Sequence, residues 1–167
     1  ELVHTLHRLP CLVLRTSRFF PEDDDSRRTR DDFFDANAKV NELLNRRVDI
    51  EDAVDAHLRA LERAPALGFG RYIVSATTPF LAADVAQLRA AAPEVVAQRV
   101  PGVEAEYRRR GWRLADAIDR VYVNTRARDE LGWQPRHDFA AVIARLAAGG
   151  DHRSALAREI GLKGYHP

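Results

Sequence analysis

Apolar and polar residues follow two patterns along this chain, one typical of strands and one with the periodicity of helices. A nearly continuous apolar run, CLVLRTS at 11–17, predicts a strand covered on both faces, and RYIVSA at 71–76 predicts a second strand. The segments EVVAQRV at 94–100 and RVYV at 120–123 indicate two shorter strands. We therefore expect several strands separated by longer segments.

Those longer segments have helical spacing. Residues 1–8 resemble the last turns of a helix, 31–47 form an amphipathic segment, and a third helix begins near Asp52. A fourth helix opens near Pro79 and is expected to bury a stripe of apolar residues, namely Leu81, Val85, Leu88 and Ala92. Strands that alternate with helices predict an α/β fold with parallel strand pairing.

The third helix has a clear apolar arc. At about 100° per residue, Val54, Leu58 and Leu61 lie close together, which predicts that they form its buried face. Asp52 and Asp55 lie on the other side, where we expect solvent.

The last third contains residues that are typical of helix starts and helix ends. Thr125 can cap a short helix, RARDEL at 126–131, that ends at Gly132, a position suited to the left-handed residue after a helix. Asp138 is expected to cap a further helix whose inner face carries Phe139, Val142, Ile143 and Leu146. No repeat or linker divides the chain, so we expect a single unit over residues 1–167.

Composition narrows the class of protein. Apolar residues make up 46% of the 167 residues and charged residues 31%, with a formal net charge of +1, which is typical of a globular protein and does not favour a nucleic-acid partner. Cys11 is the single cysteine, and no apolar run reaches the length of a membrane span. We expect a cytoplasmic protein without a membrane segment.

The sequence contains no methionine, even at position 1, so we expect a trimmed product or part of a longer chain.

One stretch looks like a reaction site. VDIEDAVDAH at 48–57 contains four carboxylates and one histidine, His57, which is the composition of a metal site or of an acid/base pair. A helix beginning near Asp52 would turn His57 away from these acids, because no acid lies three or four residues from it. We therefore expect Glu51 and Asp52 to cap the helix, and we expect no metal site here.

Complete catalytic motifs are absent. Gly68 and Gly70 precede a strand and cannot form a phosphate loop after one. No lysine stands four residues after Tyr72, Tyr107 or Tyr122, and there is no Gly-x-Ser-x-Gly elbow.

Three segments, in order, nevertheless resemble the second half of the extended short-chain dehydrogenase/reductase family, the NAD-dependent epimerases and dehydratases. LPCLVLRTSRFFPE at 9–22 resembles that family's strand and following loop. RRVDIEDAVDAHLRALERA at 46–64, followed by GRYIVSATTPF at 70–80, resembles its next helix and strand. RVYVNTRARDELGWQPRHDF at 120–139 is similar to its closing Leu-Gly-Trp-x-Pro motif, and the resemblance covers residues 1–146 in all.

This resemblance implies the C-terminal part of a Rossmann-like NAD(P)-binding fold: the last strands of the sheet together with a small substrate-binding subdomain. The family's glycine-rich loop and its catalytic Ser/Thr and Tyr-x-x-x-Lys groups would belong to an N-terminal half that these residues do not include. The implied cofactor is NAD or NADP, and no catalytic residue is assigned to this chain.

The resemblance also implies which residues face the ligands. Thr16, Ser17 and Arg18 match the strand end beside the substrate. Arg46 and Arg47 fall near a phosphate-binding arginine of the family, although a solvent-facing helix end explains them equally well. The loop that backs the nicotinamide corresponds to three residues, Phe19, Phe20 and Pro21, and ordinary core packing remains the alternative for the two rings.

The functional expectation is the substrate-binding half of an NAD(P)-dependent epimerase/dehydratase-like oxidoreductase, inactive without its cofactor-binding half. The alternative is a non-catalytic binding or scaffold module derived from the same fold. About 25 residues without a glycine separate Pro21 from Arg46, so a compact pocket for a small-molecule substrate is expected rather than a nucleotide-sugar site. An isolated half would expose strand edges and apolar surface, which makes homo-oligomerisation an open expectation.

Overall fold

The computed structural model describes residues 2–19 and 26–161 of the chain. Its elements are α1 (Leu2–His7), β1 (Cys11–Thr16), α2 (Arg27–Asp32), α3 (Asp35–Glu42), α4 (Ile50–Leu67), β2 (Phe69–Val74), the 3-10 turn η1 (Ala82–Asp84), α5 (Val85–Leu88), α6 (Ala92–Arg99), α7 (Val103–Arg110), α8 (Thr125–Leu131), α9 (Phe139–Ala147) and α10 (Ala155–Ile160). The protein is therefore a mixed α/β chain in which helices predominate, and the α/β prediction is confirmed at this level.

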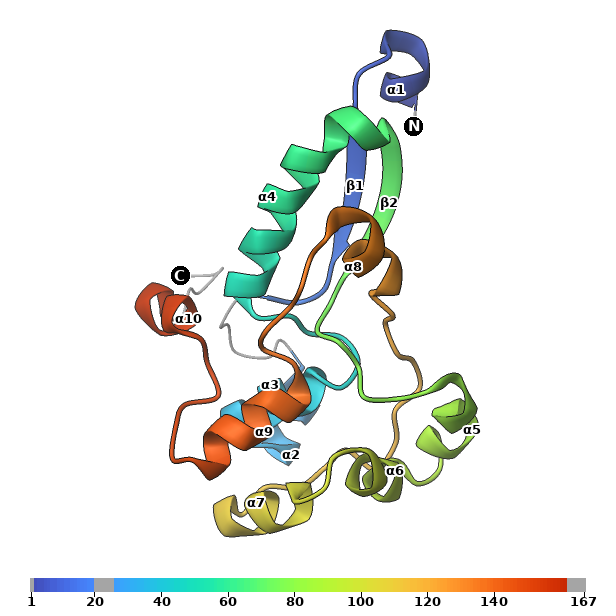
Figure 1. Cartoon of the computed structure of the whole chain (residues 1–167). Helices are drawn as coiled ribbons and strands as arrows, with labels where there is room; N and C mark the ends of the chain where they lie inside the picture. Colours follow the sequence, from blue (N-terminus) through green and yellow to red (C-terminus); the bar gives the residue numbers. More distant parts are fainter. Residues whose placement is uncertain (1, 20–25, 162–167) are drawn as a thin grey trace.

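The two strands pair in parallel. Cys11 lies opposite Phe69 and Thr16 opposite Val74, so both strands end at the same edge of the sheet. The connection between them runs through α2, α3 and α4, and α4 lies alongside the strands (Figure 1). Within the described residues β1 pairs with β2 alone, which leaves its other edge without a strand.

One core cluster joins the sheet to α4 and α8. Tyr72 and Val74 of β2 pack against Ala56 of α4 and Trp133 beyond α8. The opposite face of the sheet is more open, since the Val13 side chain is 37% exposed. The prediction that the first strand is covered on both faces is thus wrong for the described residues.

A second cluster lies beyond the carboxyl ends of the strands. It is built from one face each of α3, α6, α7 and α9, and it includes Leu44, Val96, Tyr107, Phe139 and Leu146. Figure 1 shows these helices gathered below the sheet, with α5 beside them. The carboxyl edge of the sheet therefore faces a helical layer.

The buried face of α4 is not the predicted one. Its small residues Ala53, Ala56 and Ala60 are buried, whereas Val54, Leu58 and Leu61 are 45%, 55% and 74% exposed. Alanines on the inner face allow the helix backbone to approach the strands closely, so the larger side chains point outward. Val54, Leu58 and Leu61 do lie on one side of α4, but that side faces away from the strands, so the predicted buried face is wrong.

Three further predictions are wrong. Residues 94–100 belong mainly to α6, where Pro93 occupies the first turn of the helix, and residues 120–123 form no strand. The fourth helix is replaced by η1 and α5, and of its stripe only Leu88 and Ala92 are buried, while Leu81 and Val85 are exposed.

The predicted helix ends in the last third are confirmed with one exception: Thr125 is the first residue of α8 and not its cap, because Asn124 occupies the cap position. Gly132 follows α8 with φ of 69°, in the left-handed region. Asp138 caps α9, because its Oδ1 accepts a hydrogen bond of 2.9 Å from the backbone N–H of Ala141. The predicted inner face of α9 is buried.

Candidate functional site

The predicted substrate-side residues meet at the carboxyl edge of the sheet. The N–H of Ser17 donates to the carbonyl of Val74 at 2.8 Å, which extends the pairing beyond β1. Arg18 then forms an isolated parallel bridge with Arg47, and the N–H of Val48 donates to the Arg18 carbonyl at 3.0 Å. Two segments that lie about 30 residues apart in the sequence are thus brought side by side.

A buried carboxylate that we did not predict organises the arginines at this edge. Glu42 Oε2 accepts a hydrogen bond of 2.8 Å from Arg47 Nε. Its Oε1 lies 3.0 Å from Arg46 Nη2 and 3.5 Å from Arg18 Nη1. Glu42 is itself buried, so one buried carboxylate is shared by the buried Arg47 and by two partly exposed arginines, Arg18 and Arg46.

The two predicted arginines differ in their surroundings. Arg47 is buried, and its main chain is also tied down, because its carbonyl accepts from the N–H of Ala76 at 2.8 Å. Arg46 is half exposed and lines a hollow of about 220 Å³ that also includes Asn45 and Asp119. Arg46 can therefore reach a ligand in this hollow, whereas Arg47 does not line it and holds the edge together.

Thr16 borders a separate opening, and Ser17 follows it at the strand end. Thr16 lines a hollow of about 300 Å³ together with Arg15, Ile73 and Tyr122. Ser17 is buried, and within the described residues its Oγ has no hydrogen-bond partner. A buried hydroxyl without a partner is costly, so a ligand or water at this edge would stabilise it.

Of the three residues expected beside the nicotinamide, the structure describes Phe19 alone. Phe19 packs against the core cluster of the sheet, α4 and α8, in agreement with the alternative of ordinary core packing. Phe20 and Pro21 lie outside the described residues. No glycine-rich turn follows β1 or β2, because the next glycines after them are Gly68 and Gly102. The chain alone does not fit a dinucleotide.

The carboxylates of the stretch 48–57 lie near His137 and not near His57, the histidine that the stretch contains. His57 Nδ1 lies 2.7 Å from the Ala53 carbonyl and takes no part in a cluster. Ligand atoms of Asp49, Glu51 and His137 instead lie within 4.8 Å of one another. His137 comes from the segment after α8, about 80 residues away.

This trio is poorly suited to a metal ion. Arg145 Nη2 lies 2.9 Å from His137 Nδ1, and because a guanidinium only donates, Nδ1 must accept and Nε2 carries the proton. Arg136 Nη2 also lies 2.7 Å from Glu51 Oε1. A protonated nitrogen and two nearby guanidinium groups disfavour a cation at this position.

Asp52 has a structural role that the sequence did not reveal. It was expected on the solvent side of α4, but it is buried, and its two carboxylate oxygens accept the backbone N–H groups of Arg136 and His137, each at 2.9 Å. Burial raises the pKa of the Asp52 carboxyl, although these two hydrogen bonds act in the opposite direction. The true cap of α4 is Asp49, which accepts from the Glu51 N–H at 2.8 Å.

Comparison with known proteins adds no further assignment: no family model matches the chain, and neither a curated protein nor a solved structure resembles it significantly. The class that the fold defines is a mixed α/β protein with a two-stranded parallel sheet. In the part of the chain that the structure describes, every helix is too short or too polar to cross a membrane.

Proposed function

We propose that this chain is the substrate-binding half of an NAD(P)-dependent oxidoreductase of the epimerase/dehydratase type, and that its sheet is the end of a larger Rossmann-like sheet. The observation that carries the proposal is the convergence of Thr16–Arg18 with Arg46–Arg47 at the carboxyl edge of two parallel strands. In open α/β sheets, ligands bind outside the carboxyl ends of the strands.

The exposed surfaces of the sheet and of α4 support the second part of the proposal. β1 has one free edge within the described residues, Val13 is exposed on the open face, and Val54, Leu58 and Leu61 point outward from α4. Parallel sheets are normally covered on both faces, and a free strand edge favours further pairing. A cofactor-binding half packed against these surfaces would cover them.

In this arrangement the chain contributes binding and no proton transfer. Arg46 would contact an anionic group of a small substrate from the hollow that it lines, and the Ser17 hydroxyl would donate to or accept from the substrate at the strand end. The cofactor would supply hydride chemistry when it is bound by the other half of the protein.

The proposal is tested by the coding sequence that precedes Glu1. We expect it to encode a glycine-rich turn after a strand and a Tyr-x-x-x-Lys pair on a helix close to residue 1. An upstream sequence that lacks both motifs, or a natural protein whose intact mass corresponds to these 167 residues alone, would rule the proposal out.

A further inference from the structure

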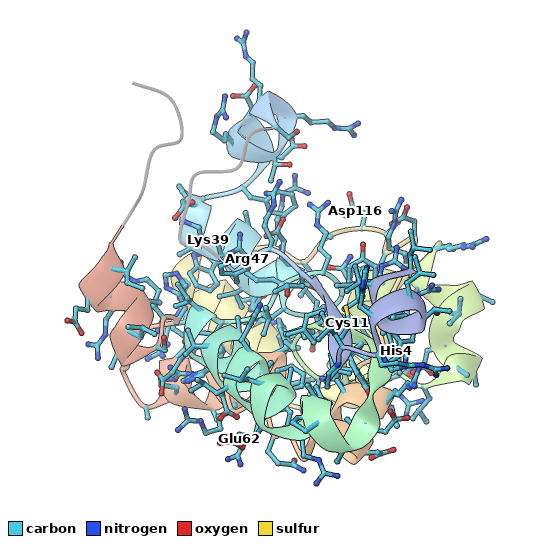
Figure 2. The ribbon with its side chains drawn as sticks, turned by 90° about the horizontal axis from the view of Figure 1, so that it is seen from above. His4, Cys11, Lys39, Arg47, Glu62 and Asp116 are labelled. Carbon is cyan, nitrogen blue, oxygen red and sulfur yellow. The ribbon has the colours of Figure 1, made fainter. Side chains whose placement is uncertain are left out.

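A small cavity lies where α3, α9 and α10 meet residues 47–49, apart from the strand-end hollows described above. Its volume is about 40 Å³. The charged and titratable side chains that line it are Lys39, Arg47, Arg153, Asp49, His137 and His152. In Figure 2, Lys39 and Arg47 lie near each other in the view from above. Three cations and a single carboxylate therefore line this space, and each cation also pairs with a carboxylate that does not line it: Lys39 with Asp35, Arg47 with Glu42 and Arg153 with Asp151.

Lys39 is the most unusual of these residues because a lysine is rarely buried. Its side chain is 9% exposed, and within the described residues its Nζ is bonded to Asp35 Oδ2 alone, at 2.6 Å. An ammonium group has three N–H donors, and a buried one is stable only when its donors are satisfied. Two donors of Lys39 thus call for acceptors inside the cavity.

His137 adds a donor of fixed identity. Because Arg145 donates to its Nδ1, the ring proton lies on Nε2. This Nε2 is buried and has no hydrogen-bond partner among the residues that the structure describes, since Glu51 Oε2, at 3.6 Å, is beyond hydrogen-bond range.

His152 reaches the same cavity from the loop before α10. Its Nδ1 lies 3.2 Å from Asp151 Oδ1, while its Nε2 is buried and likewise lacks a partner in the described part of the chain. The charge of Asp49, the only lining carboxylate, is already satisfied, because its two oxygens accept the backbone N–H groups of Glu51 at 2.8 Å and Ser154 at 3.2 Å.

We propose that this cavity binds the carboxylate group of a small organic acid. The ligand must accept hydrogen bonds from the Lys39 ammonium and the His137 Nε2–H and must carry negative charge. A buried water occupies about 10–15 Å³ of such a volume, so the cavity holds roughly three water-sized groups. That number matches the three heavy atoms of a carboxylate better than the five of a phosphate. This inference goes beyond the proposed function and does not depend on it.

The experiment is a titration of the 167-residue chain with acetate, followed by the imidazole nitrogen signals of its histidines in NMR spectra. We expect saturable shifts for His137 and His152 and none for His4, His7 and His57. Lys39→Gln should weaken acetate binding about tenfold or more, the value of one lost charge-assisted hydrogen bond. The matched control is Arg59→Gln on the surface of α4, which removes the same charge and should change the affinity less than about twofold.

Several results would overturn the proposal. Unchanged His137 and His152 signals at high acetate concentration would mean that the cavity holds only water. This titration uses the unmodified chain, so its result stands even if Lys39→Gln fails to fold. An equal loss of affinity in Arg59→Gln would mean that acetate responds to the overall charge of the protein and does not bind at Lys39. Binding of inorganic phosphate in preference to acetate would contradict the carboxylate assignment. None of these outcomes bears on the upstream motifs, so the two proposals fail independently.

Discussion

Glu42 is the residue on which the carboxyl edge of the sheet depends most. It is buried, it accepts from Arg47 Nε at 2.8 Å, and it lies within 3.5 Å of the guanidinium groups of Arg46 and Arg18. Removing one partner of a buried ion pair costs more than the pair contributes, because the remaining charge is left without compensation. The arrangement of the candidate substrate-binding residues therefore rests on a carboxylate that need not touch a ligand.

We expect Glu42→Gln to lower the free energy of unfolding by about 3–5 kcal/mol, because it removes the buried negative charge that the Arg47 guanidinium contacts at 2.8 Å. Urea denaturation followed by circular dichroism measures the change. Glu62→Gln is the matched control: Glu62 is exposed on α4 and lies 3.6 Å from Arg59, so its loss should cost less than about 0.5 kcal/mol. Equal effects of the two substitutions would show that the buried Glu42 contributes no more to stability than an exposed glutamate.

His152 makes the proposed carboxylate site sensitive to pH. Burial lowers the pKa of its imidazole, with Arg153 and Lys39 acting in the same direction and Asp151 and Asp35 opposing them. A bound carboxylate would raise that pKa, so binding takes up a proton in the pH range between the two values. Acetate affinity should therefore increase as the pH falls from about 8 to about 5. The dependence should be weaker in His152→Asn, and an identical pH profile in that variant would exclude His152 as its source.

At the scale of elements, α4 is held by its first turn. Asp49 caps it, and Asp52 fixes the segment after α8 through two backbone N–H groups, while the Asp52 carbonyl accepts from Trp133 Nε1 at 3.0 Å. The stretch 48–57 thus joins the sheet to the C-terminal part of the chain. Two of its carboxylates, Asp49 and Asp52, therefore have structural roles.

We expect Asp52→Asn to destabilise the protein by about 1–3 kcal/mol, because an amide has one acceptor oxygen and must leave one backbone N–H unsatisfied. Thermal and urea unfolding both report this loss. The control on the same helix is Asp55→Asn, which weakens only a surface pair at 3.5 Å from Arg59 and should stay within about 0.5 kcal/mol. A stable Asp52→Asn protein would contradict the role assigned to these hydrogen bonds.

The elements also show what periodicity can and cannot predict. The existence of α4, β1 and β2 followed from local patterns, because spacing and turn residues act within a few positions. The buried face of α4 did not, since alanines and larger apolar residues both recur at helical spacing and the packing partner chooses between them. In α6 the β-branched pair Val95–Val96 suggested a strand, but Pro93 at the helix start and burial of both valines favour the helix.

At the scale of the whole molecule, local patterns did not define the site. The expectation that Thr16–Arg18 and Arg46–Arg47 face a common ligand came from the family resemblance, since Arg46 and Arg47 do not end a strand, and the structure brings Arg18 beside Arg47. Glu42 could have been suspected from its position four residues before Arg46. The meeting of Lys39 with His137 and His152 could not, because it depends on how distant helices pack and no local pattern records it.

The outward face of α4 allows a test of the proposal that this chain is one half of a longer protein. In the 167-residue chain, Leu61→Glu should change the free energy of unfolding by less than about 0.5 kcal/mol, because the side chain is 74% exposed. In the longer protein that we propose, the same substitution would place a charge in an interface and should destabilise it by more than 1 kcal/mol, roughly. Ala60→Glu, at a buried position, should destabilise both. No difference for Leu61→Glu between the two proteins would mean that nothing covers this face.

The most direct measurement is a titration of the natural full-length protein that contains these residues with NADH and with NADPH, followed by quenching of tryptophan fluorescence. The account predicts saturable binding of one of the two nucleotides at one site per chain, and none to residues 1–167 alone, which lack a glycine-rich turn after either strand. A folded full-length protein that binds neither nucleotide would contradict it.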